Sequence, residues 1–410
     1  MTSTVHSGFD MTGPTSSFFN STQQSSAYDM ETSGISSTTS GSIPGKEKKR
    51  RRWGIFVGKS SKSEIKSATL GRDRAKKEKN SKDTLDKHRW STALPKSQPL
   101  PPSISKETMC QLLERKMADT QLSFAFERIP KGRDVNTDIT VALYPEHSAL
   151  NAGNMEYLPY DDNRVRLTPT KSNKHGYINA SHITATVGSS QRFYVASSVG
   201  GGPLSVQSNA ACCALWQAAW EAGARVVAHV SPAASPSHLP ELQPGRMRDY
   251  GQYQVFVESS QSSGYVVTTR LRVSNGKPIT HTGSIGQTRT VWHMQYTEWP
   301  DNMATPVSTE HFLGFLEELS AVRQHCALEM APVHNANPPL LVSCSQGVGR
   351  TGVTITADLL LYTLEHNQEV DISRVVSQLH QQRANLIQNI HQYRFIHALL
   401  IYYLKQTRLI

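Results

Sequence analysis

The pattern of apolar positions changes sharply near residue 106. Before it, apolar side chains are sparse and scattered among serine, threonine, glycine and charged residues. Beyond it, apolar residues recur at helical spacing over residues 108–117, and Phe124 and Phe126 can bury their rings against the same domain. We therefore predict a folded domain over residues 106–410. Two disordered segments precede it, a Ser/Thr-rich one over residues 1–45 and a basic one over residues 46–105.

Short apolar runs separated by turn residues predict strands in the first half of this domain. These runs lie at 177–180, 193–196, 225–230 and 265–269, and the third follows a helical pattern over 208–224. The last third has mostly helical patterns, at 309–325, 350–366, 371–382 and 391–405. Because strands come first and helices cluster later, the predicted fold class is α+β, with a mixed sheet flanked by helices.

The net charge of +10 belongs to the segment before the domain. Residues 1–105 contain 18 Lys and Arg against 9 Asp and Glu, which leaves 25 against 24 for the rest of the chain. The basic run within residues 46–90 could contact an anionic membrane surface or the nuclear import machinery. A solvated, disordered linker fits the same composition, and a nucleic-acid role is the least favoured of these alternatives.

Several cellular locations are disfavoured by the composition. No apolar run approaches the roughly 18–20 residues that cross a bilayer, and the N-terminus lacks the apolar stretch of a signal peptide. The five cysteines form neither a disulfide framework nor a CxxC metal pattern. We expect a cytoplasmic protein in a reducing compartment, with neither metal nor cofactor. The basic segment leaves cytoskeletal, membrane-associated and nuclear locations open.

The stretch from Leu340 to Gly352 carries the clearest chemical pattern. A short apolar strand would deliver Cys344 into a glycine-bearing loop that opens directly into a helix. Backbone N–H groups and the helix dipole then favour a bound phosphate and the thiolate form of Cys344. Arg350 could grip two phosphate oxygens, and the Thr351 hydroxyl could hydrogen-bond the sulfur. The phosphate-binding loop would consist of Ser345, Gln346, Gly347, Val348 and Gly349. A bare Cys-x5-Arg is common, and the alternative is a buried cysteine before an ordinary turn.

Two further segments could complete a catalytic site. Asp301 follows Trp299 and Pro300 on a segment suited to a rigid flap, where a carboxylic acid could protonate a leaving oxygen. Gln388 and Gln392 lie four residues apart at a helix entrance, where they could orient a water molecule. A turn at Asp301 and simple helix capping by the glutamines are the alternatives.

Together these three segments resemble the protein tyrosine phosphatase domain, over about residues 107–410. Further matching segments are similar to the Pez subfamily of non-receptor phosphatases: 157–167, 176–182, 290–301, 364–367 and 408–410. The resemblance implies a twisted mixed sheet between helices and hydrolysis of phosphotyrosine proteins through a phosphocysteine intermediate. It assigns Cys344 as nucleophile, Arg350 as phosphate clamp, Asp301 as general acid and Gln388 as the water-positioning residue. That subfamily usually has an N-terminal FERM domain, for which we expect no room here, so cortical targeting is not carried over.

Several positions depart from the family pattern. Ser343 replaces a histidine that helps to order the loop, and Gln346 replaces a small alanine that faces the substrate ring. Val165 stands where a tyrosine usually stacks on phosphotyrosine, and residues 302–303 differ from the usual sequence after the acid. Since these changes surround the phenyl pocket, we predict a slow phosphatase. The alternative is a pseudophosphatase that binds phosphotyrosine as a scaffold.

Overall fold

The computed structural model describes residues 105–133, 138–151, 155–199, 206–232, 243–276, 279–280, 283–284, 287–330 and 337–407. All of them lie within one compact unit, His88–Ile410. The segments predicted to be disordered fall almost entirely on residues 1–104, outside the described residues. All five cysteines are described, and none is in a disulfide.

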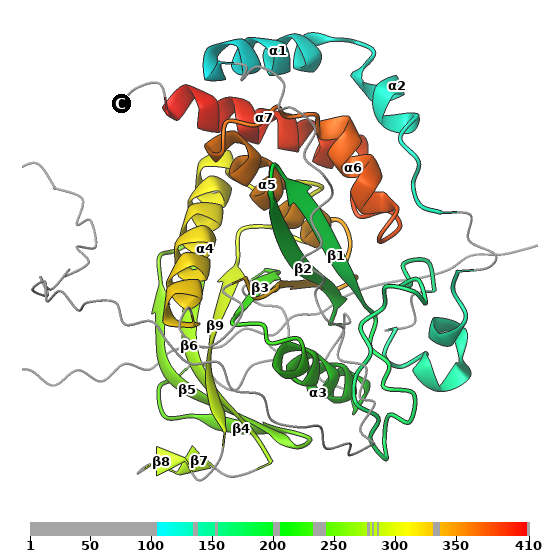
Figure 1. Cartoon of the computed structure of the whole chain (residues 1–410), viewed down its shortest axis with the longest axis vertical. Coiled ribbons are helices and arrows are strands. Elements are labelled where there is room, and N and C mark those ends of the chain that lie inside the picture. The colour runs from blue at the N-terminus through cyan, green and yellow to red at the C-terminus, as the bar shows by residue number, and fades with distance from the viewer. Residues whose placement is uncertain are drawn as a thin grey trace, which may run out of the picture. The chain divides into compact units, whose positions relative to one another are not determined.

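A mixed eight-stranded sheet forms the centre of the domain, in the order β1-β2-β10-β3-β9-β6-β5-β4 (Figure 1). The four strands from β2 to β9 in this order run parallel, and the outer pairs are antiparallel. The strands are β1 (Ala180–Val187), β2 (Ser190–Ser198), β3 (Val226–Val230), β4 (Met247–Tyr250), β5 (Tyr253–Ser262), β6 (Val266–Asn275), β9 (Thr288–Tyr296) and β10 (Leu340–Cys344). A separate two-stranded sheet pairs β7 (Ile279–Thr280) with β8 (Gly283–Ser284). The predicted fold class is confirmed.

Helices cover the sheet. Successive side chains of a central strand point to opposite faces of the sheet and therefore enter different apolar clusters. On β10, Leu340 and Val342 join the apolar cluster of the C-terminal helices, while Leu341 joins a second cluster with Trp216. The second cluster lies under α3 (Val206–Glu221). The other helices are α1 (Lys106–Ala118), α2 (Leu122–Glu127), α4 (Thr309–Met330), α5 (Arg350–Glu365), α6 (Ile372–His380) and α7 (Ile390–Gln406), with short 3-10 helices η1 (Val141–Leu143) and η2 (Pro145–His147).

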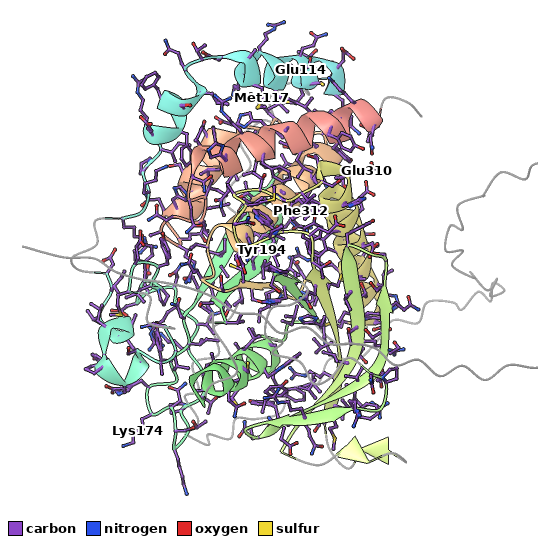
Figure 2. The ribbon with its side chains drawn as sticks, turned by 180° about the vertical axis from the view of Figure 1, so that it is seen from behind. Glu114, Met117, Lys174, Tyr194, Glu310 and Phe312 are labelled. Carbon is purple, nitrogen blue, oxygen red and sulfur yellow. The ribbon has the colours of Figure 1, made fainter. Side chains whose placement is uncertain are left out.

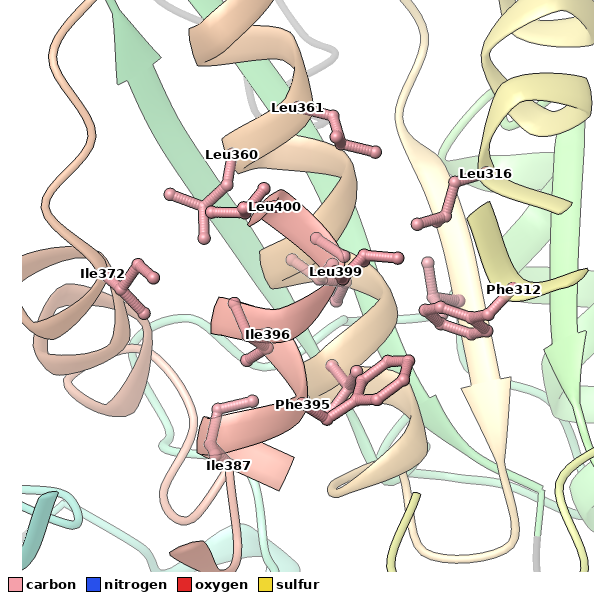
Figure 3. Close-up of a cluster of buried hydrophobic side chains, with 14 of the residues drawn as sticks. Phe312, Leu316, Leu360, Leu361, Ile372, Ile387, Phe395, Ile396, Leu399 and Leu400 are labelled. Carbon is pink, nitrogen blue, oxygen red and sulfur yellow. The ribbon is translucent and has the colours of Figure 1, made fainter. Parts of the chain in front are cut away.

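The larger cluster joins α4, α5 and α7. In Figure 3, Phe312 of α4 faces Phe395 of α7, and their ring centroids lie 5.5 Å apart. Leu399 of α7 lies beside them, whereas Leu360 of α5 lies next to Leu400 of α7, and all three leucines are fully buried. This packing fixes α5, and with it the loop between β10 and α5, against the rest of the domain.

A buried ionic cluster holds α5 to β2 and α4. Asp358 of α5 accepts hydrogen bonds from Arg192 and from the Tyr194 hydroxyl, each at 2.7 Å. Arg323 of α4 lies 3.5 Å from the same carboxylate. Burial alone would raise the pKa of Asp358, but the two guanidinium groups reverse this and lower it. Tyr194 of β2 and Phe312 of α4, both labelled in Figure 2, belong to the same apolar cluster.

Five predicted elements, at 108–117, 225–230, 350–366, 371–382 and 391–405, lie within two residues of their observed ends, whereas β2, β6, α3 and α4 differ from prediction by three to six residues at one end. The clear error is the strand predicted at 177–180, because β1 begins at Ala180 and Tyr177 belongs to the preceding loop. The Tyr177 ring is buried by stacking on His147, so its apolar character reflects a loop anchor instead of a strand. In the described part of the chain, every helix is too short or too polar to cross a membrane.

Candidate active site at the loop after β10

The loop from Ser345 to Gly349 connects β10 to α5. Cys344 is the last residue of β10, and Arg350 is the first residue of α5. Gly347 and Gly349 have φ values of 70° and 67°, which residues with a side chain rarely adopt. A Cβ at Gly347 would also lie 2.6 Å from the Ser198 backbone nitrogen. Both glycines are therefore required by the backbone path of the loop.

Carbonyl groups of this loop are held from outside it. The Ser345 carbonyl accepts a hydrogen bond from the Ser198 hydroxyl at 2.7 Å. The carbonyls of Gln346 and Gly347 accept from Arg383, at 3.4 and 2.9 Å. Because a trans peptide directs its N–H opposite to its C=O, the following N–H groups point to the other side of the loop. This arrangement makes a concave set of donors that suits an anion.

Arg383 was missed by the sequence analysis and is the main support of the loop. Its side chain is fully buried and also donates to Asn179 at 2.8 Å and to the Ser181 hydroxyl at 3.1 Å. Burial lowers its pKa to about 10, which leaves it charged near neutral pH. No local motif marks an arginine that acts by holding carbonyls 36 residues away.

Cys344 lies at the base of this loop and is 2% exposed. Its thiol donates to the Val348 carbonyl at 3.2 Å, and the Thr351 hydroxyl donates to its sulfur at 3.0 Å. The Thr351 contact is the one expected from the sequence. A hydroxyl that donates to sulfur stabilises negative charge there, both before attack and when the sulfur leaves.

Asp301 and Arg350 form an ion pair beside the loop, with Arg350 Nη2 and Asp301 Oδ1 2.7 Å apart. The Asp301 side chain is 78% exposed, whereas that of Arg350 is 12% exposed. The flap is anchored by Trp299, whose indole N–H donates to the Met303 carbonyl at 3.1 Å and whose ring packs on Phe312. The structure thus brings the predicted acid and the predicted clamp together, with the acid on the solvent side.

The two predicted glutamines lie against Gly349. The Gln392 side chain is 4% exposed, and its oxygen accepts the Gln388 backbone N–H at 2.9 Å. This is the capping contact that the sequence analysis weighed for these residues. The Gln388 side-chain amide instead donates to Gln346 Oε1 at 3.4 Å. Gln346 is exposed, and its side-chain oxygen therefore competes with water for the Gln388 amide.

Ser343, directly before Cys344, has an unexpected partner. Ser343 of β10 and His229 of β3 are register partners in adjacent parallel strands. Both are buried, and Ser343 Oγ lies 3.0 Å from His229 Nδ1. The histidine absent from position 343 is thus matched by an imidazole on the neighbouring strand. Sequence reasoning missed His229, because strand register is needed to place it.

Val165 is buried and is packed among apolar side chains. Its side chain is 3% exposed and belongs to the apolar cluster under α3, so a substrate-binding role for Val165 stays a prediction. Tyr157 is an aromatic residue in contact with Gln388: its hydroxyl interacts with the Gln388 side chain, and its carbonyl accepts from Arg383 at 3.4 Å. Partial burial raises the pKa of Tyr157. The sequence around Tyr157 did not predict this contact.

Comparison with known proteins gives one consistent result. A family model described as protein-tyrosine phosphatase matches residues 152–402. The chain is 38% identical, over 75% of its length, to tyrosine-protein phosphatase non-receptor type 21 of Rattus norvegicus and covers 25% of that protein. It is also 38% identical, over 73% of its length, to the human non-receptor type 14 enzyme and covers 24% of it. The chain thus spans about a quarter of the length of these curated relatives.

Proposed function

The chain belongs to the protein-tyrosine phosphatase family, as the sequence resemblance to its non-receptor members predicted, and we propose that it hydrolyses phosphotyrosine in proteins. The observation that carries this proposal is the grouping of Cys344, Thr351, Arg350 and Asp301 around one loop with inward N–H groups. The aligned region is about three-quarters of this chain but only about a quarter of each relative, so the activity of the whole relatives enters here as a proposal.

In the first step, the Cys344 thiolate attacks phosphorus. A sulfur–phosphorus bond forms while the bond from phosphorus to the phenolic oxygen breaks, and protonated Asp301 gives its proton to that oxygen. The Arg350 fork and the loop N–H groups hold the three remaining phosphate oxygens. Substrate phosphate must displace Asp301 from Arg350, because an ion-paired carboxylate has no proton to donate.

In the second step, water attacks the phosphocysteine and releases inorganic phosphate. The Asp301 carboxylate takes a proton from this water, and the sulfur leaves as a thiolate that the Thr351 hydroxyl stabilises. Gln388 would orient the water, as the family resemblance implies. We propose that turnover is slow, since the Gln388 side-chain amide donates to Gln346 Oε1 at 3.4 Å and would have to leave this contact to orient water.

The decisive experiment measures phosphate release from an aryl phosphate by the full chain between about pH 5 and 8. Cys344→Ser should abolish turnover, and Asp301→Ala should reduce it by roughly 10²–10⁴ while retaining phosphopeptide binding. Absence of release by the wild type at every pH would overturn the proposal.

A pseudophosphatase that binds phosphotyrosine as a scaffold is the second candidate, favoured by the Gln346–Gln388 contact. It predicts that the wild type and Cys344→Ser capture phosphopeptide equally and that neither turns it over. A cytoplasmic location remains a prediction. So do membrane, cytoskeletal or import partners of residues 46–90, because this segment lies outside the described residues.

A further inference from the structure

A cluster of possible metal ligands lies apart from the catalytic loop. Glu146 and His147 belong to η2, and His175 lies in the loop before β1. One ligand atom from each of the three residues lies within 4.8 Å of the other two. The fold therefore brings together two imidazoles and a carboxylate from positions 28 residues apart in the chain.

His147 is fixed in place before any ligand binds. It is 2% exposed and stacks on Tyr177, with ring centroids 4.2 Å apart. Its Nδ1 lies 2.6 Å from the Val141 carbonyl oxygen. Because a carbonyl oxygen can only accept, Nδ1 carries the proton and Nε2 has the free lone pair in the neutral ring. This carbonyl contact is the usual outer-shell support of a histidine that binds a metal.

The other two residues are exposed enough to adjust around an ion. The side chains of His175 and Glu146 are 41% and 56% exposed, and His175 Nε2 lies 2.9 Å from Glu146 Oε1. The His175 ring meets the His147 ring edge-on, with centroids 5.3 Å apart. The neighbouring side chain of Lys174 extends outward at the edge of the domain (Figure 2). A tetrahedral ion with bonds of about 2.0–2.1 Å needs ligand atoms roughly 3.3 Å apart. The three ligand atoms now lie within 4.8 Å of one another, and small rotations of the exposed His175 and Glu146 side chains would bring them to that spacing.

We propose that Glu146, His147 and His175 bind a zinc ion. Two imidazole nitrogens and one carboxylate oxygen suit Zn²⁺, whereas Mg²⁺ and Ca²⁺ prefer all-oxygen sites. The fourth position would be open to water. The ion would link η2 to the loop at His175. It would thus hold together two chain segments that come before and after residues 157–167 in the sequence. The proposal does not depend on phosphatase activity.

The test uses the full chain with Cys344→Ser, because an active-site thiolate could bind zinc by itself. Zinc stoichiometry after dialysis, the zinc dissociation constant and the visible spectrum of the Co²⁺ form are measured. We expect one ion per chain, the intense absorption of tetrahedral Co²⁺, and an affinity that falls at least about 10–100-fold in His175→Ala and in Glu146→Gln. Both altered side chains are exposed, so these variants should fold.

His325→Ala is the matched control, since His325 and Glu329 form an exposed pair at 3.1 Å outside the three-residue cluster. It should leave the stoichiometry, affinity and spectrum unchanged. A rise in melting temperature with Zn²⁺ that survives His325→Ala but is lost in His175→Ala would add support. Either no bound zinc, or zinc binding that is equal in His175→Ala, Glu146→Gln and the control, would overturn the proposal.

Discussion

The contact between His229 and Ser343 offers a sharp test of how the catalytic loop is positioned. Ser343 precedes the proposed nucleophile, Cys344, and its hydroxyl lies 3.0 Å from His229 Nδ1 on the adjacent strand. Because both side chains are buried, removing either partner takes this contact from a polar atom that water does not reach, although Ser343 Oγ also lies 3.5 Å from the Ala228 carbonyl. The perturbation is a double-mutant cycle with His229→Leu, Ser343→Ala and the double variant.

The expected magnitudes follow from the burial of the pair. Each single variant should lose about 1–3 kcal/mol of unfolding free energy, while the coupling between the two should be about 1 kcal/mol. If the contact also orders the loop, a similar coupling appears in the activation free energy, which corresponds to roughly fivefold in kcat. Urea unfolding of the full chain gives the first value, and aryl-phosphate turnover gives the second.

A control separates loop positioning from general stability. His397 is a buried histidine of α7 whose Nδ1 contacts the Tyr393 carbonyl at 3.0 Å. His397→Leu should therefore reduce stability without reducing kcat at temperatures where the variant is folded. Coupling below about 0.3 kcal/mol in both measurements would refute the reasoning, because changes at the two positions would then be independent.

Four other perturbations have defined outcomes. Arg383→Lys should lose roughly 3 kcal/mol in urea unfolding and at least tenfold in kcat, because an ammonium cannot hold the same set of carbonyls. Gly352→Ala should prevent cooperative thermal unfolding, followed by circular dichroism, since its Cβ would clash with the Leu386 carbonyl. Burial lowers the pKa of His397 to about 4, so the unfolded chain binds the extra proton between pH 6.5 and 4, and unfolding free energy should fall across that window. The fall should be on the order of 3 kcal/mol smaller in His397→Leu. Gln346→Ala should raise the steady-state rate of phosphate release severalfold, measured with saturating aryl phosphate.

Local sequence patterns were sufficient for most of the fold. The helices α1 and α4 to α7 have apolar residues at helical spacing, and the buried β3 and β10 are short apolar runs. The run at 177–180 misled because Tyr177 is buried by a ring stack in a loop, and burial in a loop has the same composition as burial in a strand. Periodicity cannot distinguish these two cases over four residues.

The residues of the site likewise include some that a local motif predicts and others that only the tertiary structure places. Cys344, Arg350 and Thr351 belong to one strand–loop–helix motif, so their proximity follows from local geometry. Arg383 and His229 act on that motif through long-range contacts, which depend on sheet register and helix packing. The Glu146–His147–His175 cluster also depends on a contact between distant chain segments, whereas the expectation of no metal considered only cysteine spacing.

The location of Gln346 indicates which chemical step is affected. Its side chain contacts Gln388, the proposed water-positioning residue, whereas Arg350, Thr351 and the loop carbonyls keep separate partners. Phosphate binding and sulfur attack should therefore proceed while hydrolysis of the phosphocysteine is slowed. Rapid mixing should show a burst of phenol close to one equivalent per site, followed by a slow steady phase. Gln346→Ala should accelerate that phase without changing the burst rate. A slow enzyme without a burst would place the defect in the first step, at the Asp301 flap.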